Sequence, residues 1–333
     1  MLKIGKLKLK SNLILAPMAG ITDLPFRMLC RKFGAELAFV EMINCRSISH
    51  KSRRTRQMLS TLPSDKPLGL QILGCEEKYI LKSLEVLKGY KFDILDFNAA
   101  CPAKKVVRRG EGAALLQDED KFRRLLKLVV KNSWTPVSVK IRAGWDNFSV
   151  NARRIAVIAE DCGVNALFIH GRTKAQGYSG QVDYNVIREA KKAIQIPLIA
   201  SGDIFSGALA AKMIKETGCD GLAVARGALG NPWIFAEIKE YLKKGKAPRS
   251  PKRKEVSEVM RGHLDTCIDF YGERNGVVLF RKFCIWYTKG MRKVRRLREK
   301  VSGARTRQEI EEIISNLDDQ GPVPSNYLRN LGL

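Results

Sequence analysis

Short apolar runs rich in β-branched residues recur along the chain and alternate with longer amphipathic segments. Each run has the length of a buried strand, and the spacing between runs leaves room for a helix. The eight runs are Leu13–Pro17, Leu37–Glu41, Leu68–Ile72, Asp93–Asn98, Val137–Ile141, Ala166–His170, Leu198–Ser201 and Gly221–Ala225. The pattern therefore predicts an α/β protein.

The segments between the runs carry apolar residues at helical spacing. In Glu76–Gly89, for example, every third or fourth residue is apolar, and Lys121–Val130, Ala152–Asp161 and Ala208–Thr217 repeat this pattern. Glycines follow two of these segments, where helix C-caps are expected. Eight strand–helix repeats favour a (β/α)8 TIM barrel over an open doubly wound sheet, which usually has fewer strands.

The pattern changes after residue 243. The segment 244–252 is polar and holds two prolines, which is typical of a linker. Beyond it, strand-like runs disappear and apolar residues recur at helical spacing up to Leu317. We therefore expect a barrel domain over residues 1–243, a linker over 244–252 and an all-helical domain over 253–333.

Charge indicates the kind of partner. The chain has 60 Lys and Arg against 34 Asp and Glu, a formal net charge of +26, which favours a polyanion. Arg281–Arg307 holds eleven basic residues and one acid, interleaved with Trp286 and Tyr287, and Arg46–Arg56 holds five basic residues and no acid. Basic charge beside aromatic side chains suits RNA, although a charge run is more often a solvated surface.

Other classes are disfavoured by the same sequence. No apolar run reaches the length of a membrane span, and the basic N-terminus lacks a signal-peptide pattern. The eight cysteines contain no CxxC pair and only three histidines accompany them, so we expect no metal site. Scattered thiols without a secretory signal are typical of a reduced compartment, and we expect a cytoplasmic monomer.

Candidate chemistry lies where the predicted strands end, because barrel active sites form at the C-terminal ends of the strands. Ser201-Gly-Asp203 and Arg226-Gly227 place glycine backbones and an arginine there, which suits a phosphate as well as it suits two ordinary turns. Lys140 ends a β-branched run. Its ammonium would face an anionic or electron-rich ring atom in the barrel mouth, unless it is a solvated surface lysine.

Cys101 follows another strand and precedes a loop with four positive charges, at positions 104, 105, 108 and 109. Such charges can lower the pKa of a thiol or place it beside a phosphate backbone. A cysteine with a suitable pKa can also act as a general acid. A small buried cysteine is the plain alternative, but the position at a strand end favours a functional thiol.

Six ordered segments of the chain resemble motifs of the dihydrouridine synthase family, and the similarity is greatest to its bacterial B type. The likeness covers about residues 10–243. The segments are Leu15-Ala-Pro-Met-Ala-Gly-Ile-Thr-Asp23, Asn98-Ala-Ala-Cys-Pro-Ala-Lys-Lys105, Val139-Lys-Ile-Arg-Ala-Gly-Trp145, Ile169-His-Gly-Arg-Thr173, Ala200-Ser-Gly-Asp-Ile204 and Ala225-Arg-Gly-Ala-Leu-Gly-Asn-Pro-Trp233.

The resemblance implies an FMN-dependent barrel with a helical tRNA-recognition domain. NADPH or NADH would reduce FMN, flavin N5 would deliver hydride to uracil C6, and Cys101 would protonate C5. The FMN site would comprise Pro17, Met18, Ala19, Gln71, Lys140, His170, Ser201, Gly202, Asp203, Ala225 and Arg226. Asn98 and Arg172 would face the uracil. From the basic runs rather than from the resemblance, we expect Lys104, Lys105, Arg292 and Arg295 to contact the RNA.

Three positions depart from the family pattern. Ala100 stands where glycine usually precedes the catalytic cysteine, Ser201 replaces a frequent asparagine, and Ala225 replaces a frequent glycine. Each substitution adds or changes only a small group. The protein could therefore retain FMN less strongly, but we do not expect it to lose activity.

The sequence leaves other functions open. An FMN barrel oxidoreductase that acts on a free pyrimidine is disfavoured by the basic tail. An RNA-binding chaperone with an inactive barrel is disfavoured by the polar strand ends. Ribosomal RNA remains an alternative target. Which uridine is modified, and whether NADPH or NADH is the reductant, are left undecided by the residues.

Overall fold

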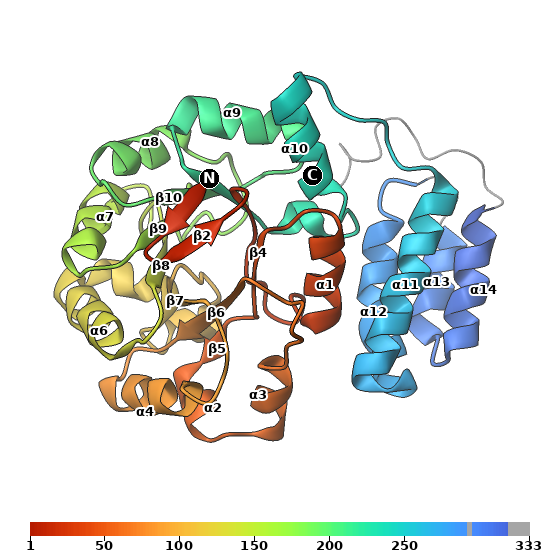
Figure 1. The fold of residues 1–333 in the computed structure, drawn as a ribbon, viewed down its shortest axis with the longest axis horizontal. Coiled ribbons are helices and arrows are strands. Elements are labelled where there is room, and N and C mark those ends of the chain that lie inside the picture. The colour runs from red at the N-terminus through yellow and green to blue at the C-terminus, as the bar shows by residue number, and fades with distance from the viewer. Residues whose placement is uncertain (292–294, 319–333) are drawn as a thin grey trace. The chain divides into compact units, whose positions relative to one another are not determined.

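The computed structural model describes residues 1–291 and 295–318, and within them the chain forms two compact units (Figure 1). The first unit holds Met1–Asp23, Ala35–Gly202 and Lys212–Ala225. The second holds Leu24–Gly34, Asp203–Ala211 and the chain from Arg226 onward. The predicted domain boundaries at residues 243 and 253 stay a prediction, although the segment 245–252 contains neither helix nor strand.

A closed barrel of eight parallel strands forms the centre of the first unit. Parallel pairing runs in the order β4, β3, β11, β10, β9, β8, β7, β6, and pairing between β4 and β6 closes the ring. The strands are β3 (Leu13–Leu15), β4 (Leu37–Phe39), β6 (Leu68–Leu73), β7 (Ile94–Ala99), β8 (Val137–Arg142), β9 (Ala166–His170), β10 (Leu198–Ser201) and β11 (Gly221–Val224). Each overlaps one predicted run, so the TIM-barrel prediction is confirmed.

Amphipathic helices lie around the outside of these strands (Figure 1). They include α4 (Glu77–Leu87), α6 (Glu119–Asn132), α7 (Ala152–Asp161), α8 (Tyr184–Lys192) and α9 (Gly207–Thr217). Side-chain caps fix two of their N-termini, because Asp118 and Asp183 accept backbone N–H bonds from Lys121 and Val186. Gly163 and Gly218 follow α7 and α9 with positive φ, as the C-cap prediction required.

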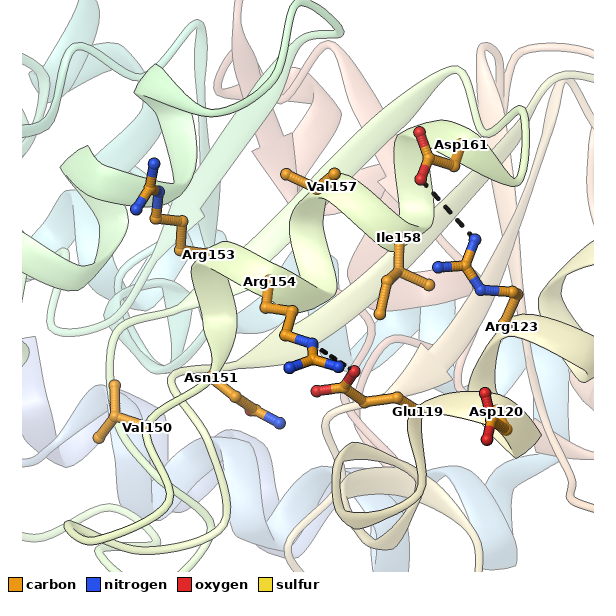
Figure 2. A pocket seen from close by; sticks show the side chains of 10 residues that line it. All are labelled: Glu119, Asp120, Arg123, Val150, Asn151, Arg153, Arg154, Val157, Ile158 and Asp161. Atoms are coloured by element: carbon orange, nitrogen blue, oxygen red, sulfur yellow. Dashed lines mark ion pairs between the residues drawn. The ribbon is translucent and has the colours of Figure 1, made fainter.

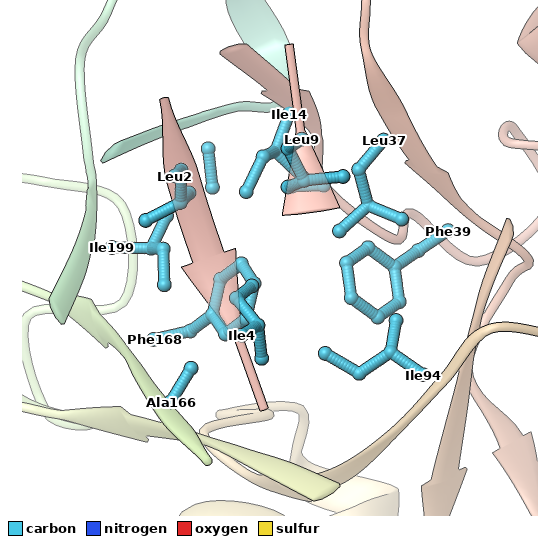
Figure 3. Packing of buried hydrophobic residues seen from close by; sticks show 12 residues of the cluster. Leu2, Ile4, Leu9, Ile14, Leu37, Phe39, Ile94, Ala166, Phe168 and Ile199 are labelled. Atoms are coloured by element: carbon cyan, nitrogen blue, oxygen red, sulfur yellow. The ribbon is translucent and has the colours of Figure 1, made fainter. Parts of the chain in front are cut away.

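An N-terminal hairpin, which the strand pattern did not predict, closes the end of the barrel where the strands begin. It consists of β1 (Leu2–Ile4) and β2 (Leu7–Leu9). Leu2 lies against Gly221 at the start of β11. Together with inward side chains of β3, β4, β7, β9, β10 and β11, the hairpin builds an apolar floor (Figure 3). The floor residues are Leu2, Ile4, Leu9, Ile14, Ala16, Leu37, Phe39, Ile94, Ala166, Phe168, Ile199 and Ala223.

Short helices, 3-10 turns and one short strand lie in the loops that follow the strands. They are β5 (Ile43–Asn44), which pairs with β6, the helices α2 (Cys45–Ser49), α3 (Arg53–Met58) and α5 (Lys104–Val107), and the 3-10 turns Gly112–Gln117 and Arg226–Ala228. None of the helices in the described ranges combines the length and apolar character that a bilayer crossing requires.

The second unit is helical. Its helices are α1 (Leu24–Lys32), α10 (Ile234–Lys244), α11 (Arg253–Tyr271), α12 (Glu273–Tyr287), α13 (Arg295–Gly303) and α14 (Arg307–Asp318). Aromatic rings form its core, with Phe26 of α1 stacked on Phe283 of α12 at 5.2 Å between centroids. His263 is fully enclosed by these rings, and burial lowers its pKa to about 3, so the imidazole is neutral and structural.

Candidate active site

Polar side chains form a layer inside the barrel directly above the apolar floor. Side chains two residues apart on a strand point to the same side, so Asp96 and Asn98 share the inward face of Ile94. Strand register pairs Gln71 with Asp96, Asp96 with Ser138, and Asn98 with Lys140. The strand ends therefore bring a carboxylate, an ammonium and several amides and hydroxyls into one layer.

Asp96 is the centre of this layer. It is 1% exposed, and its two oxygens accept hydrogen bonds from Ser138 Oγ at 2.7 Å and from Gln71 Nε2 at 2.6 Å. Gln71 Oε1 in turn accepts a hydrogen bond from Asn98 Nδ2 at 2.7 Å. Burial raises the pKa of Asp96 to about 6, against the lowering effect of these donors and of Lys140.

Lys140 points inward from β8. Its Nζ donates to Ser201 Oγ on β10 at 3.2 Å, and that hydroxyl donates to the carbonyl of Ile169 at 3.0 Å. Burial lowers the pKa of Lys140 to about 8, while the nearby Asp96 carboxylate opposes the shift. The side chain is therefore half-buried and directed inward, so it is not a solvated surface lysine, and its role in a site stays a prediction.

The loop that carries Cys101 is fixed from three sides. Asn98 Oδ1 accepts the backbone N–H groups of Ala100 and Cys101 at 3.0 and 2.9 Å. Arg142 Nε donates to the carbonyl of Ala100 at 2.8 Å, and the N–H of Ala113 donates to the carbonyl of Cys101 at 3.1 Å. A free thiol thus stands half-buried at the end of β7 in a defined position.

The electrostatics of Cys101 differ from the expectation of a lowered pKa. Burial raises the pKa of the thiol, and this outweighs the lowering effects of a backbone hydrogen bond at Ala103 and of the Arg142 charge. Lys104 and Lys105 are exposed on α5, so solvent screens them from the thiol. The expectation was wrong because it counted charges along the chain and ignored burial. A thiol that keeps its proton is a proton donor rather than a nucleophile.

Two buried arginines hold the loop that follows β9. Arg142 Nη1 donates to the carbonyls of Thr173 and Gly177 at 2.9 and 2.8 Å, and Arg172 Nε donates to the carbonyl of Ser179 at 3.0 Å. Arg142 therefore ties this loop to the Cys101 loop. Sequence reasoning did not single out Arg142, although it stands two residues after Lys140 on the same strand and face.

A half-buried glycine, Gly202, follows β10 and lies beside His170. Gly202 has φ +122°, and a Cβ there would lie 2.8 Å from Val182 Cγ2 and 3.3 Å from the His170 ring. Only glycine fits this position without strain, and its bare backbone can approach a ligand closely. In the second unit, Asp203 Oδ1 pairs with Arg226 Nη2 at 2.7 Å, and Asp203 itself has a positive φ of 49°.

The remaining predicted residues of the first unit lie in loops or at strand ends. Pro17 and Met18 are half-buried and Ala19 is exposed in the loop after β3. Met18 N–H donates to Thr22 Oγ1 at 3.0 Å, which fixes that loop. Ala225 follows β11 and packs against the floor.

The basic tail is less available than its sequence indicates. Arg281 Nε donates to the carbonyl of Ala304 at 2.7 Å, and Arg298 Nη2 donates to the carbonyl of Thr288 at 2.6 Å. Tyr287 is fully buried beside His263, so the expectation of an aromatic surface is wrong at this position. Arg292 lies outside the described residues. Arg295 begins α13, and its side chain also lies outside the described part of the chain.

A separate hollow of about 590 Å³ lies on the outer wall of the barrel, between α6 and α7 (Figure 2). Its charges are largely paired, since Arg154 binds Glu119 at 2.6 Å and Arg123 binds Asp161 at 3.7 Å. No predicted site residue lines it. The enclosed polar layer, and not this hollow, is the candidate active site.

Comparison with known proteins agrees with this geometry. The family model described as dihydrouridine synthase matches residues 14–320. The chain is 40% identical over 292 residues to a Rickettsia conorii protein named probable tRNA-dihydrouridine synthase, covering 87% of this chain and 88% of that protein. It is 41% identical over 288 residues to tRNA-dihydrouridine synthase B of Vibrio parahaemolyticus, covering 86% and 89%.

Solved structures show the same fold at low identity. Histamine dehydrogenase from Rhizobium sp. 4-9 is similar with a TM-score of 0.56 and 11% identity over 79% of this chain and 50% of that chain. A 2-naphthoyl-CoA reductase is similar with a TM-score of 0.58 and 11% identity over 72% and 51%. At this identity the likeness concerns the barrel fold alone.

Proposed function

Because the chain belongs to the dihydrouridine synthase family, we propose that it reduces the C5=C6 bond of uridines in tRNA, with a flavin as hydride donor. The observation that carries this proposal is the polar layer inside the barrel, where Lys140 and Cys101 stand on neighbouring strands above a closed apolar floor. This layer is shielded from bulk water by the floor below it and offers both a cation and a proton donor.

The residues present fit an FMN group. The inward ammonium of Lys140 suits the N1/C2=O edge of a flavin, which becomes anionic on reduction. The bare backbone at Gly202 suits a phosphate. Within the second unit, the Arg226 guanidinium beside Asp203 is a cation of the kind that phosphates bind. Gln71, His170, Ser201, Asp203 and the loop Pro17–Ala19, together with Ala225, complete the proposed FMN site.

A bound flavin would supply hydride chemistry for C6 of the uracil. Cys101 would donate its proton to C5, so that one hydride and one proton would saturate the double bond. A raised thiol pKa suits this role because the thiol remains protonated near neutral pH. We propose that Asn98 and Arg172 hold the uracil edge. In the structure Asn98 also shapes the Cys101 loop, and Arg172 also holds the loop after β9.

RNA must present an unstacked base to this enclosed site, and the energy of unstacking is offset by contacts to its backbone. We propose that Lys104 and Lys105, exposed on α5, and Arg292 and Arg295 of the basic tail bind RNA phosphates. We further propose NADPH, or NADH, as the reductant of the flavin, and a cytoplasmic monomer as the working form.

Mapping dihydrouridine in RNA from cells with and without this gene tests the function. The proposal expects that particular tRNA uridines lose the modification when the gene is deleted. Loss of dihydrouridine from ribosomal RNA alone would favour the ribosomal alternative, and unchanged RNA with efficient reduction of free uracil would favour a pyrimidine oxidoreductase. Unchanged RNA together with a purified protein that binds no flavin would favour the chaperone alternative.

A further inference from the structure

The buried carboxylate of Asp96 has no role in the chemistry proposed so far. It lies between the apolar floor and the Cys101 loop, and it is 1% exposed. Burying an ionised carboxylate is costly unless hydrogen bonds and charges compensate. A carboxylate kept at this depth therefore indicates a function that an apolar residue of similar size would not perform.

A continuous chain of hydrogen bonds leads from Asp96 to the backbone of Cys101. Gln71 Nε2 donates to Asp96, Asn98 Nδ2 donates to Gln71 Oε1, and Asn98 Oδ1 accepts the N–H groups of Ala100 and Cys101. The two links between side chains and the two bonds from the backbone span 2.6 to 3.0 Å, which is good hydrogen-bond geometry.

The two ends of this chain determine its direction. An ionised carboxylate only accepts, and a backbone N–H only donates. Each side-chain amide has one accepting oxygen and one donating nitrogen, so the amides of Gln71 and Asn98 satisfy both ends in a single orientation. A protonated Asp96 would present a donor at one oxygen and weaken that constraint.

We propose that Asp96 is a positioning residue, whose carboxylate orients the Gln71 and Asn98 amides and through them fixes the loop that places the Cys101 thiol. The inference rests on the proposed function only for the role of Cys101. Lys140 is the charged group that acts on this carboxylate, and Arg142 acts on Lys140 in turn. Asp96 thus links the proton donor on one side of the site to the cation on the other.

The variant D96N tests this arrangement, because it keeps the size of the side chain and removes its fixed acceptor character. In flavin-loaded protein at saturating tRNA, we expect faster alkylation of Cys101 by iodoacetamide and a kcat for dihydrouridine formation lowered roughly tenfold to 100-fold, as for a misplaced catalytic group. The matched control is S138A, which removes a hydrogen bond to the same carboxylate outside the chain to Cys101, and it should lose less activity.

A measurement on the unaltered protein keeps the test decisive if D96N does not fold. Side-chain amide NMR signals of Gln71 and Asn98, assigned from Q71M and N98A, should shift together with a midpoint near pH 6, since burial raises the pKa of Asp96 to about 6. Amide signals that stay constant from pH 5 to 8, or wild-type alkylation and kcat in D96N, would overturn the inference. Because the amide and alkylation readouts need no turnover, they separate this inference from a failure of the proposed function.

Discussion

The apolar floor and the polar layer of the barrel interior are built from the same strands but have different roles. On β7 the step from Ile94 to Asp96 passes from the apolar floor to the polar layer, and on β9 the step from Phe168 to His170 does the same. The floor supplies burial and therefore stability. The polar layer retains a buried carboxylate and a lysine with a perturbed pKa, which is typical of functional sites. On each of these strands, therefore, a residue that contributes to stability lies only two positions before a residue of the candidate site.

Substitution at the top of the polar layer should have the largest effect on the reaction. C101A removes the proposed general acid and should lower dihydrouridine formation by about 10²- to 10⁴-fold. Flavin binding and flavin reduction by NADPH should survive, because the thiol contributes to protonation at C5 alone. Stopped-flow absorbance and nucleoside mass spectrometry measure these steps separately.

The matched control for this variant is C75A. Cys75 is also a free, half-buried thiol, but its Sγ donates to the carbonyl of Arg109 outside the barrel interior. Near-normal product formation by C101A, or an equal loss in C75A, would show that Cys101 is a structural cysteine.

Substitution in the floor should affect stability and leave the chemical roles in place. Phe168 is 1% exposed and meets the Phe39 ring edge-on at 5.5 Å between centroids. F168A should lower the free energy of unfolding by about 3–5 kcal/mol, since it leaves a cavity in a packed core. Denaturant unfolding measures this loss. If F168A were neutral for stability while it altered the pH profile of turnover, the division between floor and polar layer would be wrong.

Lys140 should matter for the flavin more than for the fold. K140Q removes an ammonium that we propose contacts the flavin ring, and a hydrogen bond from a charged group contributes about 1.5–3 kcal/mol, equivalent to roughly 10- to 150-fold in affinity. Wild-type affinity should fall as pH rises through about 8, because burial lowers the pKa of Lys140 to about 8 and the ammonium then loses its proton.

Fluorescence titration of the apoprotein with FMN checks both expectations about Lys140. K140Q should bind FMN more weakly at neutral pH and show no loss of affinity near pH 8, while its melting temperature should not fall. An equal affinity and an equal pH profile in K140Q and wild type would remove Lys140 from the flavin site.

We expect the smallest effect on the reaction from substitutions outside the barrel interior, which should change tRNA binding alone. Arg53, Arg54 and Arg56 are exposed on α3, in a stretch without acidic residues from 46 to 64. Replacing all three with Ala should flatten the slope of log K against log salt for tRNA by about 2 to 3 units, at 0.7 to 0.9 per phosphate. R123A with R154A is the matched control, since both arginines are paired on the outer wall (Figure 2). An equal slope for both variants would assign RNA binding elsewhere.

Much of the fold could be predicted from local pattern. The eight barrel strands and α7 follow from periodicity, because alternation and helical spacing are properties of consecutive residues. The N-terminal hairpin was missed because its three-residue strands alternate leucine with lysine and are too short to give a signal. The candidate site was proposed from the rule that barrel strand ends carry chemistry, which favoured Cys101 and Lys140, while the family resemblance added His170.

The contacts within the site could not be predicted in this way. Arg142 binds carbonyls of two loops that follow different strands, and carbonyl acceptors leave no trace in a sequence. The pKa of Cys101 depends on burial, which the count of nearby lysines and arginines does not report. Tyr287 stands among basic residues in the sequence yet faces the core, because its helix turns that position inward.

The central claim is that the protein reduces uridine within tRNA at the polar layer. The most direct measurement incubates the purified, flavin-loaded protein with NADPH and unmodified tRNA transcript, and counts dihydrouridine by mass spectrometry, with ribosomal RNA and free uridine in parallel. We predict that dihydrouridine forms at defined positions of the tRNA, with far less product in the other two. Oxidation of NADPH without dihydrouridine in the tRNA, or equal product from free uridine, would contradict the account.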